Sequence, residues 1–303
     1  HNGRRRQRQM CIRDSCRADG KGEVTMKLTS EKIFKYPPTG MEAFLTILFI
    51  VTLGWLYSLL QLLNLKDGGG FGQFGPGMEI LDLANFYFVD NPYSYLANLS
   101  FCSTPDGTWT IETWLGSFVM WFSMVLAMMV PSLLPSIRSK RFNSTFVFWF
   151  FLGYIIVWSL CCMVGVSLQW MLYSAGLLNN QMVISQPWFS SIIFFIIGVY
   201  QFSRFKMSAC VSRKRLLDLA AGPSTSNADK LHYGKQYGLA CVRGCCPLML
   251  GMFALGLMNI VAMLALTMVM FMENNTPAIG QHAKLFGSAS IALGFISLFY
   301  NFL

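Results

Sequence analysis

Long runs without charge are the feature of this sequence that most limits its fold. Seven mostly apolar stretches follow one another along the chain. Most of them reach the length of about 20 residues that a helix needs to cross a hydrocarbon core about 30 Å thick. Only 12% of the residues are charged, against about 25% in a typical soluble domain. The sequence therefore predicts an all-α, polytopic transmembrane helical bundle with about seven spans.

Each predicted span is bounded by charged, glycine-rich or otherwise polar residues. The spans are Glu42–Leu65, Thr113–Ile137, Thr145–Leu168, Trp188–Phe205, Tyr237–Leu257, Asn259–Met272 and Ala283–Leu303. The fifth and sixth form one apolar run that is too long for a single crossing, and Gly256 and Asn259 offer a tight turn between them.

We interpret residues 26–303 as a single integral membrane domain with two long loops. The outer loop, residues 66–112, opens with the flexible sequence DGGGFGQFGPG, and its aromatic-rich middle, MEILDLANFYFV, predicts an interfacial helix. The inner loop, residues 206–235, contains the small, polar sequence AAGPSTSNAD and is expected to be flexible. Residues 1–25 are basic and without periodicity, and we expect a non-native or disordered leader that ends before Met26.

The basic residues lie mainly between the apolar runs, on one predicted side of the membrane. This distribution fits the rule that cytoplasmic loops carry Lys and Arg, so the net charge of +9 does not indicate nucleic-acid binding. The lipid bilayer is the expected partner instead. We therefore predict a cytoplasmic N-terminus and an external C-terminus.

Acidic residues and histidines are absent from the interior of the predicted spans, which argues against several functions. Glu112 and Glu273 fall at span ends, whereas proton-coupled transporters place carboxylates at membrane depth. Lys284 lies at the mouth of the last span, which does not suit the Schiff base of a retinal protein. No catalytic set can be placed together, so the sequence does not favour an enzyme.

Sulfur-bearing side chains are the remaining candidates for chemistry. Cys241, Cys245 and Met249 share one face of the fifth span because they are four residues apart. Thiolate and thioether ligands are soft and select Cu(I). We therefore predict a soft-metal site. Its candidate ligands are Cys241, Cys245, Cys246, Met249, Met124, Met128 and Cys210, the last placed just inside the fourth span.

A packing interpretation of the same residues stays open. Methionine is an ordinary core residue, and free cysteine behaves as a small buried hydrophobe. Cys161 and Cys162 are adjacent and point to different faces, so we interpret them as packing residues. Arg243 either extends its charge to the cytoplasmic interface or balances thiolate charge, and its place near the span end favours the interface.

Three motifs resemble a bacterial family of predicted metal-binding integral membrane proteins of unknown function. They are M-x-x-A-M-M-x-P-S-x-x-P at Met124–Pro135, Y-Q-x-S-x-x-K-x-x-x-C at Tyr200–Cys210, and Y-G-x-x-C-x-x-G-C-C followed by a methionine at Tyr237–Met249. The resemblance covers residues 113–273 and implies an all-helical protein of the bacterial inner membrane with a metal site. Family members usually carry a second cysteine shortly after the one matching Cys210, where this chain reads VSRKR.

Together these observations favour a membrane bundle that binds Cu(I) through Cys and Met. Its role would be copper handling, or service as an accessory to a copper-dependent membrane enzyme. The alternative is a structural subunit that holds no metal and packs against other membrane subunits of a larger complex. A transporter is the third possibility.

Overall fold

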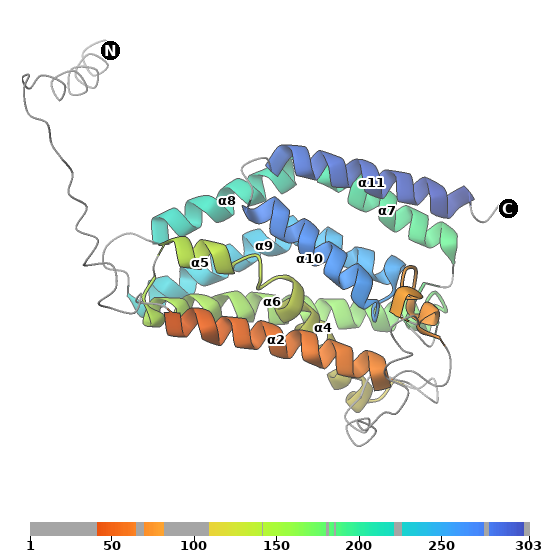
Figure 1. The fold of residues 1–303 in the computed structure, drawn as a ribbon, viewed down its shortest axis with the longest axis horizontal. Helices are drawn as coiled ribbons and strands as arrows, with labels where there is room; N and C mark the ends of the chain where they lie inside the picture. The colour runs from red at the N-terminus through yellow and green to blue at the C-terminus, as the bar shows by residue number, and fades with distance from the viewer. Residues whose placement is uncertain are drawn as a thin grey trace, which may run out of the picture. The chain divides into compact units, whose positions relative to one another are not determined.

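Helices packed side by side make up nearly all of the computed structural model that is described (Figure 1). The described residues all lie in the unit Pro38–Leu303. They are 41–64, 70–81, 109–140, 142–179, 182–184, 186–220, 226–275 and 279–299. The expected leader at residues 1–25 lies outside this part of the chain, as does Cys102.

The chain passes back and forth along the bundle (Figure 1). In chain order the helices are α2 (Met41–Asn64), the 3₁₀ helix η2 (Phe71–Phe74), α4 (Ile111–Met128), α5 (Leu134–Lys140), α6 (Ser144–Ser174), α7 (Pro187–Gln201), α8 (Arg204–Ala220), α9 (Asn227–Leu255), α10 (Ile260–Asn275) and α11 (Ile279–Phe299). α5 continues the direction of α4, as α8 continues that of α7 (Figure 1).

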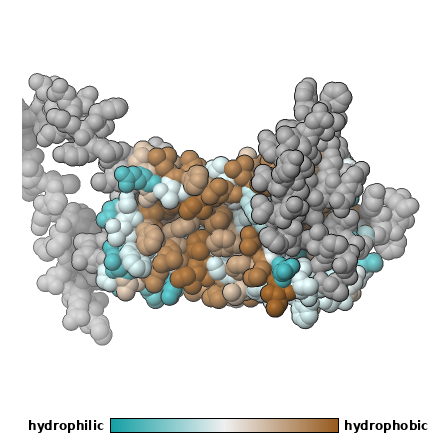
Figure 2. Space-filling view, turned by 90° about the horizontal axis from the view of Figure 1, so that it is seen from below, coloured by the Kyte–Doolittle hydropathy of each residue, from teal (hydrophilic) through white to brown (hydrophobic). Residues whose placement is uncertain are grey.

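The expected membrane helical bundle is confirmed by the length and composition of these helices. Within the described residues, α2, α4, α6, α9 and α11 are each long and apolar enough to cross a membrane. α7 and α8 pass the same test together, with a bend of 58° between them, and α10 is apolar but shorter. Figure 2 shows one face, on which hydrophobic residues form a broad band beside hydrophilic residues at the left end. The count of seven spans stays a prediction.

The second predicted span, Thr113–Ile137, is wrong as one continuous helix. α4 ends at Met128, and a turn leads into α5. Pro131 lies in that turn and Pro135 follows in the first turn of α5. Proline lacks a backbone N–H and disfavours helical geometry in the residue before it, so the prolines account for the break.

Most of the predicted inner loop, residues 206–235, is helical, and the middle of its small, polar sequence, residues 221–225, lies outside the described part. α8 occupies its first half, and α9 begins at Asn227, ten positions before the predicted span start at Tyr237. Ser203 makes the bend between α7 and α8, because its hydroxyl accepts the backbone N–H of Lys206. Ser226 and Asp229 form a capping box that starts α9. Cys210 consequently belongs to α8 and not to the fourth span.

The predicted turn at Gly256 and Asn259 is confirmed. Gly256 has a φ of +100°, and a Cβ there would lie 2.1 Å from the carbonyl oxygen of Phe74, so only glycine fits. The Asn259 side chain accepts the backbone N–H of Ala262 and donates to the carbonyls of Leu255 and Pro76.

The same contacts correct the expectation for the glycine-rich start of the outer loop. Phe71, Phe74 and Met78 are buried against the bundle, so this part of DGGGFGQFGPG is anchored rather than flexible. The predicted interfacial helix begins at Met78, and its residues from 82 onward lie outside the described part.

α9 lies at the centre of the helix packing. Its most extensive contact is with α6, and it also packs on α7 and α8. Gly234 allows the close approach to α6, because a Cβ there would lie 2.0 Å from the carbonyl oxygen of Phe150. Small residues at such crossings are typical of membrane helix pairs. The result is that the cysteine-bearing part of α9 is enclosed by three helices.

The topology is testable at two exposed positions, Thr110 before α4 and Asn227 at the start of α9. These positions lie at opposite ends of the bundle (Figure 1). A membrane-impermeant maleimide should label Thr110→Cys in intact cells and should reach Asn227→Cys only after permeabilisation, with the unsubstituted chain as the baseline. Labelling of both positions in intact cells would contradict the predicted orientation.

Candidate metal centre

Two thiols on α9 face the inside of the bundle one helical turn apart. Cys241 and Cys245 are both buried. The Tyr154 hydroxyl on α6 lies 3.6 Å from Cys241 Sγ. Tyr237 and Phe150 pack beside it, with ring centroids 5.4 Å apart. The pair therefore lies in a largely apolar, aromatic environment.

A buried arginine from α8 points at this pair. The Arg213 guanidinium donates to the sulfur atoms of Cys241 at 3.9 Å and Cys245 at 3.8 Å. Its other terminal nitrogen donates to Cys210 Sγ at 3.0 Å, one turn earlier on α8. Arg213 is only 4% exposed. Within the described residues, all of its hydrogen bonds go to thiols. Three sulfurs therefore surround one positive charge.

A second buried charge pair lies beside this cluster. Lys206 Nζ on α8 is 2.8 Å from each carboxylate oxygen of Glu273 on α10, and both side chains are almost fully buried. A small cavity of about 20 Å³ lies between Glu273, Cys210 and Arg213. Because Lys206 and Glu273 neutralise each other, Arg213 is the uncompensated charge in this region.

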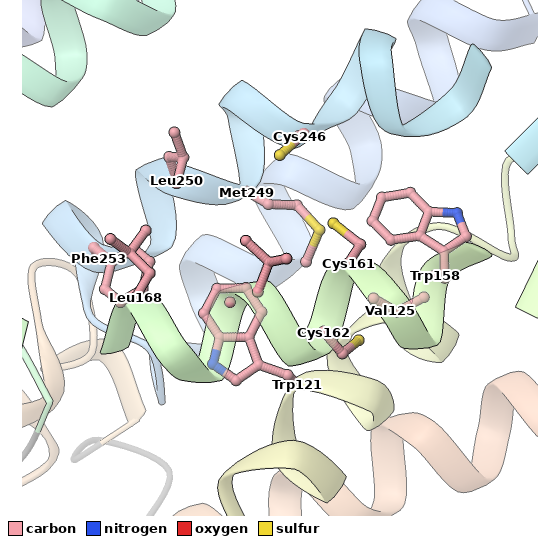
Figure 3. A pocket seen from close by; sticks show the side chains of 12 residues that line it. Trp121, Val125, Trp158, Cys161, Cys162, Leu168, Cys246, Met249, Leu250 and Phe253 are labelled. Atoms are coloured by element: carbon pink, nitrogen blue, oxygen red, sulfur yellow. The ribbon is translucent and has the colours of Figure 1, made fainter. Parts of the chain in front are cut away.

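A second group of sulfurs lines a larger cavity. The cavity has a volume of about 60 Å³ and lies between α4, α6 and α9. Cys161, Cys246 and Met249 line it together with Trp121 and other apolar side chains. Cys161 on α6 and Cys246 on α9 therefore face the same space from two helices. Figure 3 shows the sulfurs of Cys161 and Met249 pointing toward one another, with Cys246 close by.

Pro247 lies between the sulfur-bearing residues of α9. It cannot donate the backbone hydrogen bond that would satisfy the Arg243 carbonyl. The Tyr200 hydroxyl on α7 donates to that carbonyl instead. The Arg243 side chain itself is exposed and donates to the backbone of Leu239. Arg243 therefore does not contact the thiols, whereas Arg213 does.

The structure divides the predicted ligand set. Cys241, Cys245 and Cys210 gather around Arg213, whereas Cys246 and Met249 line the larger cavity. Met124 and Met128 are buried in the main core and line neither of the two cavities. Among the described residues, no three His, Cys, Asp or Glu side chains are already clustered as metal ligands.

Four residues that belong to the two sulfur groups or to the ion pair beside them were not identified from the sequence: Arg213, Lys206, Glu273 and Cys161. The spacing C-x-x-R at Cys210–Arg213 puts both side chains on one helix face, and this was a usable signal. The pairing of Lys206 with Glu273 had none, because the two residues are far apart in the sequence and meet only through the fold.

Comparison with known proteins connects this arrangement to copper. Residues 118–297 match the model of the family PpoB2, described as a copper chaperone, and this region covers more than half of the chain. The chain belongs to this copper chaperone family. No curated protein and no solved structure shows a significant match.

The family match begins within α4 and ends within α11, so it contains both sulfur groups and the buried charges. It places the chain among proteins of copper handling. The resemblance found from the sequence motifs implied a metal-binding membrane family of unknown function. Membership of a copper-related family supports the copper expectation that the sulfur-bearing side chains gave, and the description of the family as one of unknown function is replaced.

Proposed function

We propose that this chain is a membrane-embedded copper chaperone that holds Cu(I) on the thiolates of Cys241 and Cys245, with Arg213 as their counter-charge. The observation that carries the proposal is the arginine. It is buried, and its hydrogen bonds go to Cys210, Cys241 and Cys245. Family membership supplies the copper context.

Burial explains why the arginine indicates thiolates. A charge removed from water is costly unless it is paired and hydrogen-bonded. No carboxylate in the described residues hydrogen-bonds to Arg213, since Glu273 is occupied by Lys206. The sulfurs of the surrounding cysteines are therefore the groups available to balance its charge. A thiolate is also a much better acceptor for a guanidinium than a thiol, because charged hydrogen bonds are about twice as strong as neutral ones.

Charge balance also favours a monovalent metal ion. Two thiolates carry two negative charges, and Arg213 carries one positive charge. A monovalent cation completes a neutral group, whereas a divalent cation would leave a net positive charge inside the bundle, which is costly there. Among the metal ions that soft sulfur ligands select, Cu(I) is the monovalent one.

Cu(I) binding replaces the protons of the coordinating thiols and leaves the oxidation state of copper unchanged. At each coordinating cysteine an S–H bond breaks, a Cu–S bond forms and the proton leaves to solvent, while copper remains Cu(I). Cys210 is the third sulfur near Arg213. It accepts a hydrogen bond from one terminal nitrogen of the guanidinium, whereas Cys241 and Cys245 accept from the other. We assign Cys210 the role of positioning Arg213 through that hydrogen bond.

The test is copper analysis of the full chain purified under copper-replete, reducing conditions. The wild type should hold stoichiometric copper, and Cys241→Ser with Cys245→Ser should hold at least one ion less per chain. Cys162→Ser is the matched control, because Cys162 is buried on α6 but makes no contact with Arg213 in the described hydrogen bonds. A wild type without copper would favour the alternative of a structural subunit.

A further inference from the structure

The cavity between α4, α6 and α9 has a composition that packing alone does not require. Its walls carry the sulfurs of Cys161, Cys246 and Met249 (Figure 3). The space has a volume of about 60 Å³, whereas about 10–15 Å³ is enough to hold a water molecule. The lining also includes a fourth sulfur, that of Cys162, and the remaining described lining is apolar and includes Trp121 and Trp158.

We propose that Cys161, Cys246 and Met249 form a second Cu(I) station, separate from the site at Arg213. Two thiols and one thioether from two helices converge on one space, and such ligands select Cu(I) over hard ions. This inference rests on the proposed copper-binding function of the chain. It adds a ligand, Cys161, that lies outside the first site, and it gives Cys246 and Met249 a place of their own.

The charge environment distinguishes the two stations. No Asp, Glu, Lys, Arg or His belongs to the described lining of this cavity. A Cu(I) ion with one thiolate is neutral there, and the second thiol and the thioether complete the coordination without adding charge. One S–H bond breaks, one Cu–S bond forms from that thiolate, and one proton leaves to solvent. The first site, next to Arg213, accommodates two thiolates instead.

The two stations are contiguous along α9. Cys245 and Cys246 are consecutive residues, so one turn of the helix presents a sulfur toward Arg213 and the next sulfur toward Cys161. The outer wall of the cavity includes Val164, which is 68% exposed. The second station therefore lies between the enclosed first site and the outer surface of the bundle.

Copper stoichiometry in matched cysteine variants tests the second station. The full-length wild type should bind two Cu(I) ions per chain under reducing conditions. Cys161→Ala with Cys246→Ala should bind one, as should Cys241→Ser with Cys245→Ser, and the combined variant should bind none. Met252→Leu is the control, because Met252 is buried on α9 and lines neither of the two cavities, and it should bind two.

The outcomes separate this inference from the proposed function. A wild type that binds one ion, retained in the Cys161/Cys246 variant and lost in the Cys241/Cys245 variant, would overturn the second station alone. A wild type that binds none would overturn both. Met249→Leu, which conserves volume, guards against misfolding of the double variant. If Met249→Leu binds one of the two ions more weakly, the second station is supported. If it binds both ions as the wild type does, Met249 is not a ligand of that station.

Discussion

Replacing Lys206 by methionine should destabilise the bundle by about 3–5 kcal/mol, because it leaves the Glu273 carboxylate buried without its partner. The two side chains are in contact at 2.8 Å and both are about 2% exposed, so solvent cannot replace the lost charge. The pair joins α8 to α10 and thereby holds the helix that carries Cys210 and Arg213. The measurement is the free energy of unfolding in detergent or bicelles, compared with the wild type.

A double variant and a surface variant make this measurement specific. Lys206→Met with Glu273→Gln removes both charges and should recover most of the lost stability, since replacing a whole buried pair is often neutral. Lys214→Met removes an exposed cation from the same helix and should change the stability by no more than about 0.5 kcal/mol. If Lys206→Met is as stable as the wild type, the ion pair does not hold α8 in place.

The sequence was sufficient for the helices that are apolar throughout. α2 and α11 agree closely with the first and seventh predicted spans, because a long uncharged run has few alternatives in a membrane. The break after Met128 and the helix α8 were missed for different reasons. The prolines near Met128 are visible in the sequence, but the predicted span was drawn through them because the whole stretch is apolar. α8 was missed because its Lys and Arg residues indicated a solvated cytoplasmic loop.

The candidate site was predictable in the same uneven way. The spacing of Cys241 and Cys245 was enough to put both on one buried face of α9. Their separation from Cys246 and Met249 depends on which neighbouring helix faces each side of α9. That arrangement of α6 and α8 is tertiary information. The same holds for Lys206 and Arg213, whose charges are buried only because α8 folds back onto α9 and α10.

Replacing Arg213 by methionine should weaken Cu(I) binding at Cys241 and Cys245 without unfolding the chain. Methionine keeps an unbranched apolar side chain but removes the charge and the three hydrogen bonds to sulfur. Hydrogen bonds to charged groups contribute about 1.5–3 kcal/mol, so the affinity should fall by roughly 10- to 150-fold at about 1.36 kcal/mol per factor of ten. Competition with a Cu(I) chelator measures it, in a Cys161→Ala/Cys246→Ala background that isolates the first site.

The effects on stability and on affinity separate a metal-site role from a structural one. In the copper-free chain Arg213 is a buried cation among sulfurs, so its removal should cost little stability, as in other replacements of buried charge by apolar groups. Copper should raise the thermal stability of the wild type more than that of Arg213→Met, because the stabilisation by a ligand increases with its affinity for the folded protein. Arg243→Met is the matched control, since that arginine is exposed on α9 and should leave affinity unchanged. Equal copper affinity in the wild type and in Arg213→Met would mean that the arginine is a packing residue and that the thiolates obtain their counter-charge elsewhere.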